Sequence, residues 1–335
     1  QLRTLYLDPM RTQLDAMQRM LIAMRGVHAG SAAKVQGLAE GAMPAIRWPS
    51  AVYLDELMEQ YGLKPSIDNL VLGVTYDEQG NEHLVTGSME EMIHILIGAA
   101  SGYGKSTLEQ SLAYQAALSE TPCDLALVDY GAVTFGHFAR CKNLLYPIAD
   151  TPELAIALFR ALIAELARRK EMFKAYPGVS SLSQFNQTAG ADLRPIICFC
   201  DESSQLFVKD GVKDPLVALA SMARKFGLWI VAAGTDFKAT TIPTEASVNF
   251  STRIALRSRP TMSRILIDSK DAMYLKAKGR ALALLPGRDQ VEIQTPMVRD
   301  WSKLPTGGPQ QTIDLSSCPG GRAEQGSHSP MDRGD

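Results

Sequence analysis

A glycine-rich stretch between a short apolar run and a helix-forming segment constrains this chain more than any other feature. The apolar run is Ile93–Ile97, residues 98–107 read Gly-Ala-Ala-Ser-Gly-Tyr-Gly-Lys-Ser-Thr, and Leu108–Leu118 can form a helix. Strand, glycine loop and helix in this order are typical of a P-loop, whose backbone N–H groups and helix start bind nucleotide phosphates. The stretch therefore predicts a nucleotide site in an α/β fold.

The residues of this loop have separate expected tasks. Lys105 is expected to reach the β- and γ-phosphates of ATP, and the Ser106 hydroxyl to bind Mg²⁺. The usual pattern has a glycine six residues before the lysine, where this chain has Ala99, with Gly98 displaced by one. The alternative is a helix that happens to begin with Gly-Lys-Ser. The expected nucleotide-binding residues are Ser101, Gly102, Tyr103, Gly104, Lys105, Ser106 and Thr107.

A second motif supplies an acidic pair after an apolar run. Ile196–Cys200 leads directly into Asp201 and Glu202. This is the form of a Walker B segment, in which Asp201 would hold the Mg²⁺ shell and Glu202 would polarise the attacking water. We expect this strand beside the P-loop strand, because ligands lie at the carboxyl ends of parallel strands. A strand-end surface pair is the alternative, but together with the loop the pair favours an ATP hydrolase over a kinase.

Strands alternate with helices over most of the chain. Apolar runs after the P-loop predict further strands, and segments with helical periodicity lie between them. This alternation predicts an α/β fold, a RecA-like P-loop NTPase with a parallel sheet and helices on both faces. The expected strands are 124–128, 196–200, 228–233 and 252–257, and the expected helices are 215–226 and 154–173, the latter after an N-cap at Thr151 and Pro152.

The chain divides by composition into four parts. Met and Leu in 4-3 spacing over residues 10–26 predict a helix that docks on the domain or on a neighbour. A helix over 51–61 and strand-like runs over 69–76 and 82–87 make up the second part. The expected parts are an N-terminal helix and linker (1–48), a small α/β lead-in segment (49–90), a P-loop ATPase motor domain (91–302) and a disordered tail (303–335) rich in Gly, Pro, Ser and Gln.

Composition limits the partners and the environment. Of 335 residues, 46% are hydrophobic and 21% charged, and the formal net charge is -2, so any contact with DNA must come from local patches or a ring interior. The five scattered cysteines fit a reducing cytosol. No apolar run is long enough to span a membrane, so we expect a cytoplasmic protein without membrane contact in this chain. Because the chain begins with Gln, association through upstream segments or partners stays open.

Several motifs in a fixed order resemble those of the FtsK/SpoIIIE motor ATPases. The resemblance runs from about Leu72 to Arg299 and includes the P-loop and the Asp-Glu pair. The most specific part is the spacing of a Glu-x-x-Arg-Arg run, a Gly-Val pair and an aromatic-Asn pair. The matching segments are 127–129, 165–170, 178–179, 185–186, 249–255, 263–268 and 278–282.

This resemblance implies a homo-oligomeric ring, expected to be a hexamer, that surrounds double-stranded DNA and moves it with ATP. It also makes Arg253 a candidate arginine finger donated to a neighbour's γ-phosphate, with a structural ion pair as the alternative. Basic loops inside the ring would contact the DNA. The candidates are Lys209–Lys213, and Lys174 together with Gly178–Asn186, and solvated loops are the alternative reading of both.

The chain departs from the family pattern at the sensor position. After the fourth strand the family has Gln followed by Arg, whereas this chain has Thr235 and Asp236. The Thr235 hydroxyl can bond a phosphate or a water, but the side chain is shorter, which puts the coupling of hydrolysis to movement in doubt. No winged-helix sequence reader is expected after Arg299.

Two other functions stay open. A secretion or conjugation ATPase of the wider FtsK/HerA group would move protein or a protein–DNA complex, and the near-neutral charge and the altered sensor allow this. The other is an ATP-binding ring subunit that hardly hydrolyses ATP.

Overall fold

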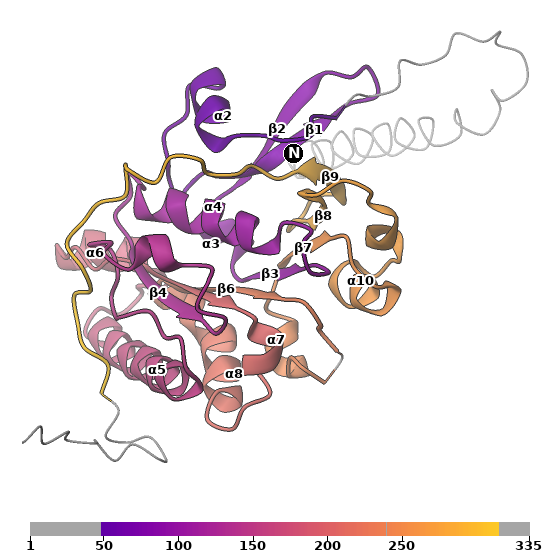
Figure 1. Cartoon of the computed structure of the whole chain (residues 1–335). Helices are drawn as coiled ribbons and strands as arrows, with labels where there is room; N and C mark the ends of the chain where they lie inside the picture. Colours follow the sequence, from indigo (N-terminus) through magenta and orange to yellow (C-terminus); the bar gives the residue numbers. More distant parts are fainter. Residues whose placement is uncertain (1–47, 239, 315–335) are drawn as a thin grey trace, which may run out of the picture. The chain divides into compact units, whose positions relative to one another are not determined.

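One nine-stranded sheet organises the described part of the chain (Figure 1). The computed structural model describes residues 48–238 and 240–314, so the helix expected over 10–26 lies outside the described residues. The strand order is β2-β1-β9-β8-β7-β3-β6-β5-β4. The strands are β1 (Leu70–Tyr76), β2 (Glu82–Gly87), β3 (Ile95–Gly98), β4 (Asp124–Asp129), β5 (Ile196–Asp201), β6 (Leu228–Gly234), β7 (Thr252–Leu256), β8 (Arg280–Leu284) and β9 (Val291–Gln294).

The parallel half of the sheet confirms the predicted strands. β7, β3, β6, β5 and β4 pair in parallel, and the residues of β3, β4, β5 and β6 are all buried. Strands covered on both faces read as continuous apolar runs, which is why the sequence revealed them. One expectation is wrong. The strand that leads to Asp201, β5, does not lie beside the P-loop strand β3, because β6 pairs with both of them.

The other half of the sheet is antiparallel, and its two middle strands, β8 and β9, were not predicted. β8 and β9 pair with each other, β8 pairs with β7, and β9 pairs with β1. The hairpin β1–β2, which lies in the predicted lead-in segment 49–90, therefore extends the same sheet. Gly73 allows this approach, since a Cβ at that position would lie 2.4 Å from the carbonyl oxygen of Gln294.

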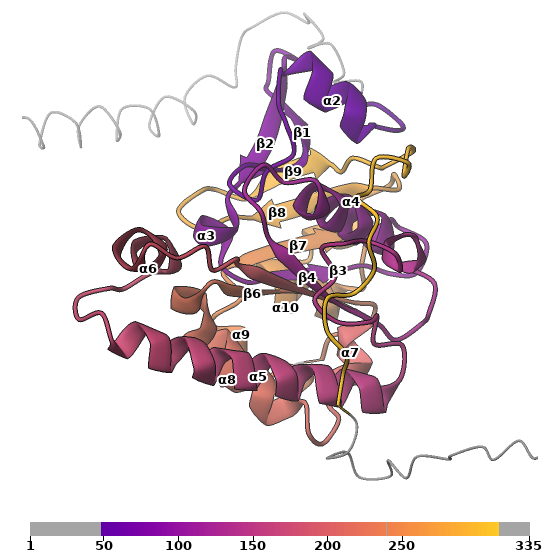
Figure 2. The same ribbon diagram turned by 90° about the vertical axis from the view of Figure 1, so that its left-hand side faces the viewer.

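Helices cover both faces of the sheet, as predicted (Figure 2). One apolar core lies between the sheet and α4 with α2, and the other lies between the sheet and α5, α8 and α10. The predicted cap of α5 is confirmed, because the Thr151 hydroxyl accepts a hydrogen bond from the Leu154 amide at 3.3 Å and Pro152 opens the helix. The helices are α2 (Leu54–Gln60), α3 (Met89–Met92), α4 (Lys105–Ala117), α5 (Pro152–Lys174), α6 (Leu182–Ala189), α7 (Ser203–Leu206), α8 (Lys213–Met222), α9 (Thr244–Ser247) and α10 (Pro260–Ile267), with 3₁₀ turns at Gly136–Phe138, Ala223–Phe226 (η3) and Asp271–Tyr274.

The segment 303–314 differs from the disordered tail that we expected. Its backbone bonds to the loop after β4, with the Lys142 amide donating to the Pro305 carbonyl at 2.8 Å and the Gln310 amide donating to the Leu144 carbonyl at 2.9 Å. Just before it, the Trp301 ring stacks on His137 with centroids 4.3 Å apart. These contacts offset the low apolar content from which disorder was inferred. Residues 315–335 lie outside the described residues.

None of the described helices combines the length and the apolar character that crossing a bilayer requires.

Candidate nucleotide-binding site

The glycine loop joins β3 to α4 with the geometry that a phosphate cradle needs. Gly102 and Gly104 have φ values of 82° and 102°, which side chains with a Cβ rarely adopt. A Cβ on Gly104 would also lie 3.2 Å from the Gly279 amide nitrogen. Ala99 has no such conformation, is fully buried, and its amide donates to the Gly234 carbonyl at 3.3 Å. The missing first glycine is therefore tolerated by the backbone at Ala99.

A cavity of about 520 Å³ opens over this loop. The P-loop contributes part of the lining, and Glu202 and Thr235 also line the cavity. Residues at the ends of β8 and β9 and in the segment before α2 complete the lining. The sequence analysis assigned none of them to a nucleotide site, although segment 278–282 matched a family motif. The residues that complete the lining are Ser50, Ala51, Val52, Lys278, Gly279, Gln294, Thr295 and Met297.

Six of the seven predicted nucleotide-binding residues line the cavity, and Tyr103 does not. The lining residues are Ser101, Gly102, Gly104, Lys105, Ser106 and Thr107. The Tyr103 ring instead lies 5.2 Å from the Arg257 guanidinium, and its carbonyl accepts a hydrogen bond from the Gly279 amide at 3.0 Å. Tyr103 thus fastens the loop to the antiparallel half of the sheet.

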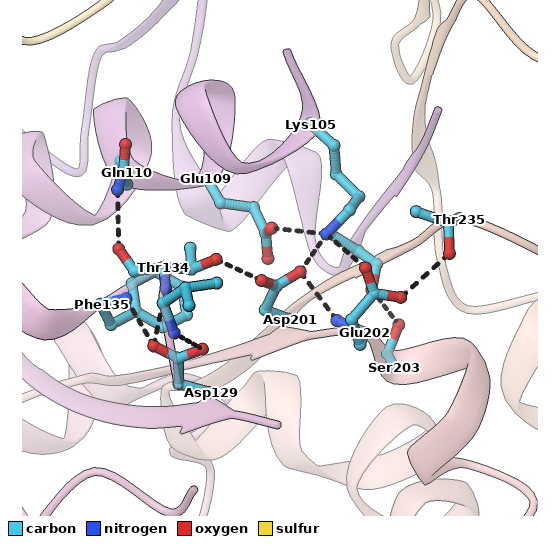
Figure 3. Close-up of polar contacts among 12 residues, drawn as sticks. Lys105, Glu109, Gln110, Asp129, Thr134, Phe135, Asp201, Glu202, Ser203 and Thr235 are labelled. Atoms are coloured by element: carbon cyan, nitrogen blue, oxygen red, sulfur yellow. Dashed lines mark hydrogen bonds and ion pairs between the residues drawn. The ribbon is translucent and has the colours of Figure 1, made fainter. Parts of the chain in front are cut away.

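Lys105 lies in a cluster of three carboxylates (Figure 3). Its Nζ donates to Asp201 Oδ1 and lies 3.3 Å from Glu202 Oε1 and 3.7 Å from Glu109 Oε2. Burial opposes the charge on Lys105, but the carboxylates of Glu109 and Asp201 outweigh it and raise the pKa of the amine. The structure thus brings the P-loop lysine and the acidic pair together as the sequence predicted.

Glu109 is a member of this cluster that sequence reasoning missed. It lies on α4 one turn after Lys105, is fully buried, and neither of its carboxylate oxygens has a hydrogen-bond partner. Burial and the neighbouring Asp201 raise its pKa well above the usual value. An acidic residue four positions after the lysine faces the same side of the helix, and that spacing is the signal that could have found it.

The Asp201 carboxylate has a second partner that the sequence did not reveal. The Thr134 hydroxyl, from the loop after β4, donates to Asp201 Oδ2. Burial works against the charge on Asp201, but Lys105 and Thr134 outweigh it and lower the pKa of the carboxyl. Thr134 itself is held by Asp129, which also accepts the amides of Val133 and Phe135 at 3.1 and 2.7 Å.

Glu202 is paired with Thr235, the residue at the altered sensor position. The Thr235 hydroxyl, just after β6, donates to Glu202 Oε2 at 3.0 Å. Glu202 has a φ of 49°, an unusual left-handed conformation for a side chain of this kind. Backbone strain of this sort costs about 1–3 kcal/mol and persists where the surroundings hold it, commonly at functional sites.

Arg253 is not brought to this site in its own chain. Its guanidinium donates to three backbone carbonyls, those of Ser247, Phe250 and Ile265, at 3.1–3.2 Å. Arg253 pairs across the sheet with Leu96, two residues before the end of β3. These contacts tie the start of β7 to α9, to the loop after α9 and to α10, and they occupy three of the five N–H donors of the guanidinium.

The fold and the site define the chain as a P-loop NTPase in class, with a glycine loop at the carboxyl end of a parallel strand and an Asp-Glu pair against its lysine. The FtsK/SpoIIIE family model matches residues 68–247, and the chain belongs to this family. The resemblance inferred from the sequence motifs is thereby confirmed.

Curated relatives are similar over most of this chain. It is 28% identical over 267 residues to DNA translocase SftA of Bacillus subtilis, which covers 76% of this chain and 28% of SftA. It is 27% identical over 237 residues to DNA translocase FtsK of Caldanaerobacter subterraneus, which covers 69% of this chain and 33% of that protein. The chain thus spans less than two thirds of the length of these relatives.

Solved structures share the fold. The conjugation coupling protein TcpA of pCW3, in its monomer form with ATPγS, aligns with a TM-score of 0.65 and 22% identity over 76% of this chain and 72% of TcpA. The cytoplasmic domain of the type VII secretion ATPase EccC of Thermomonospora curvata aligns with a TM-score of 0.64 and 21% identity, over 79% of this chain and 36% of EccC.

Proposed function

We propose that this chain binds and hydrolyses ATP as the motor part of a ring that moves double-stranded DNA. The observation that carries the hydrolase step is the cluster of Lys105, Asp201 and Glu202, of which Lys105 and Glu202 line the P-loop cavity. In this proposal Lys105 turns from the carboxylates to the phosphates of ATP, and Glu202 orients the attacking water. Thr235 holds the Glu202 carboxylate in place, a task for which its short side chain suffices.

The residues present fit Mg²⁺ as the accompanying ion. Even when Glu109 is protonated, the carboxyl groups of Asp201 and Glu202 face a single ammonium group, so the site has room for the charge of a divalent cation. No group of three or more His, Cys, Asp or Glu side chains forms a metal cage among the residues that the structure describes. Mg²⁺ commonly binds to one or two protein oxygens and to substrate phosphates, and Ser106 with Asp201 would supply these oxygens. Bound Mg²⁺ would neutralise charge on the phosphates.

A basic surface at the amino ends of β5 and β6 supports contact with DNA. Phe173 at the end of α5 stacks on Phe185 of α6 with centroids 4.5 Å apart and packs against Phe226 of η3 at 4.9 Å. These ring contacts bring exposed cations of two elements, α5 and η3, next to α6. We call Lys174, Arg224 and Lys225 the α6 basic surface. The competing loop carries Lys209 and Lys213 with Asp210 and Asp214, so its formal charge cancels.

Ring assembly and the DNA cargo rest on the relatives. The curated relatives are named DNA translocases, and this chain matches about a third of their length. We infer a homo-oligomeric ring, with six subunits as the expected number, because a ring lets successive subunits hold one duplex. Secretion or conjugation cargo is the second candidate, favoured by the likeness to TcpA and EccC. The net charge of -2 does not separate the two.

ATPase rates with and without duplex DNA test this proposal. We expect duplex DNA to stimulate turnover, and Lys105→Ala and Glu202→Gln each to remove it, with Glu202→Gln retaining bound ATP. Turnover that ignores DNA but requires a partner polypeptide would favour secretion. Nucleotide binding without turnover in the unmutated chain would instead favour a subunit that binds ATP and hardly hydrolyses it.

A further inference from the structure

The Asp201 carboxylate is held from both of its oxygens. Oδ1 accepts from the Lys105 amine and from the Glu202 amide, the latter at 2.8 Å. Oδ2 accepts from the Thr134 hydroxyl. Asp201 and Thr134 are both 2% exposed, so water does not compete for this contact. Two of the three partners lie within the P-loop and Walker B motifs, and Thr134 lies in neither.

Thr134 is itself fixed by its own loop and by α4 (Figure 3). Asp129 accepts the Thr134 amide at 2.9 Å and also accepts the two adjacent amides. From the other side, Gln110 Nε2 donates to the Thr134 carbonyl at 2.7 Å. Three successive amides on one buried carboxylate define the loop backbone, because each hydrogen bond to a charged group is strong. The hydroxyl therefore reaches Asp201 from a preset position.

We propose that Thr134 is a positioning residue that orients Asp201 for the divalent cation that accompanies the nucleotide. This inference rests on the proposed function. When Lys105 turns to the phosphates, Oδ1 loses its cation, while the bond from Thr134 to Oδ2 persists and keeps the carboxylate in one plane. Oδ1, which faces the cavity-lining Lys105 in this structure, is then free of the lysine and already oriented toward the place that the cation would take. Outer-shell partners of this kind commonly change metal affinity by about 10–100-fold.

The test compares Thr134→Val, which keeps the shape and removes the hydroxyl, with Thr134→Ser, which restores it. Affinity for a fluorescent ADP is measured with the full chain, once in saturating Mg²⁺ and once in EDTA. We expect Thr134→Val to lose about tenfold or more of the affinity gained through Mg²⁺, and Thr134→Ser to regain most of it. Thr121→Val is the matched control, because the Thr121 hydroxyl also donates to a carboxylate, that of Asp68, outside the cavity.

An equal loss of affinity in Mg²⁺ and in EDTA, or an unchanged gain through Mg²⁺, would overturn the assignment in favour of a purely structural loop. If Thr134→Val does not fold, Gln110→Ala is tested in its place, since it releases only the Thr134 carbonyl. A partial loss of the nucleotide affinity gained through Mg²⁺ supports the proposal, and an unchanged gain overturns it.

A second measurement separates a failure of the Thr134 proposal from a failure of the proposed function. It follows Mn²⁺ binding to the protein alone by electron paramagnetic resonance. If the unmutated chain binds no nucleotide, the proposed function fails, and weaker Mn²⁺ binding by Thr134→Val than by Thr134→Ser still decides the role of Thr134.

Discussion

Two adjacent carboxylates lie against the P-loop lysine, and each is bonded to a threonine hydroxyl that follows a different strand. Asp201 is bonded to Thr134 after β4, and Glu202 is bonded to Thr235 after β6. Because the strand ends meet at one edge of a parallel sheet, residues far apart in sequence fix neighbouring side chains separately. The two carboxylates can therefore be oriented for different tasks, one toward a cation and the other toward water.

The contacts of Arg253 predict a loss of stability when it is shortened. Arg253→Ala leaves three backbone carbonyls without donors, and at roughly 1 kcal/mol for each hydrogen bond the free energy of unfolding should fall by about 2–3 kcal/mol. Urea unfolding monitored by circular dichroism measures this. The free energy of unfolding of Arg253→Lys, whose amine can donate to one of the carbonyls, should lie between those of the unmutated chain and Arg253→Ala. Unchanged unfolding together with lost turnover, rescued by mixing with Lys105→Ala subunits, would instead establish the arginine finger.

At the scale of elements, the sequence predicted the strands that are fully buried and the motifs whose residues are contiguous in the chain. The parallel strands were predictable because burial on both faces leaves uninterrupted apolar runs. β8 was matched only as part of the family segment 278–282, and two of the four residues of β9 are half-exposed, so neither was recognised as a strand. In the site, the P-loop and the Asp-Glu pair were predictable as local motifs. Thr134 was not, since its contact with Asp201 spans 67 residues and depends on the strand order.

The long helix α5 shows how a recognisable motif can serve packing. Glu165 bonds to both Arg168 and Arg169, at 2.7 Å in each case. Arg169 is buried and donates to the carbonyls of Phe226 and Arg194 at 2.7 Å. This motif joins α5 to η3 and to the start of β5, which places the cations of the α6 basic surface.

The junction of β3, β6 and α8 predicts a pH dependence of stability. The buried His94 ring bonds to the Ile230 amide through Nδ1 at 3.0 Å and to the Ala220 carbonyl through Nε2 at 3.1 Å. Burial, with a smaller effect of Arg224, lowers the pKa of His94 from 6.5 to about 4. His94 is therefore protonated below pH 6.5 in the unfolded chain but only below about pH 4 in the folded chain. Because the unfolded chain binds this proton first, the free energy of unfolding falls as the pH falls from 6.5 to about 4.

From these values, His94 should lower the free energy of unfolding by about 2 kcal/mol between pH 8 and pH 5. His94→Gln, whose amide does not titrate, should be less stable at pH 8 but should lose about 2 kcal/mol less than the unmutated chain on going to pH 5. Urea unfolding of both proteins at the two pH values gives the difference. An identical pH dependence of the two proteins would show that His94 is not the responsible group.

At the scale of the whole molecule, the sheet separates two surfaces. The P-loop cavity lies at the carboxyl ends of the parallel strands, whereas Arg224 and Lys225 precede β6 at its amino end. In the proposed motor, a nucleotide-driven change would therefore travel along the strands of the sheet to reach the α6 basic surface. β6 is the direct route, since Thr235 follows its last residue and η3 lies before its first.

If the α6 basic surface contacts DNA, reversing its charge should remove stimulation by duplex DNA. We expect Arg224→Glu with Lys225→Glu to abolish the stimulation and to flatten the dependence of the logarithm of DNA affinity on the logarithm of salt concentration. Each DNA phosphate that the variant no longer neutralises should reduce that slope by about 0.9, because fewer counterions are released. Lys209→Glu with Lys213→Glu is the matched control, with the same charge change in a loop whose own acids already balance it. If duplex DNA still stimulates the Arg224→Glu, Lys225→Glu variant but not the control variant, the DNA contact lies in the loop over 209–213. Full stimulation of both variants would favour a cargo other than duplex DNA.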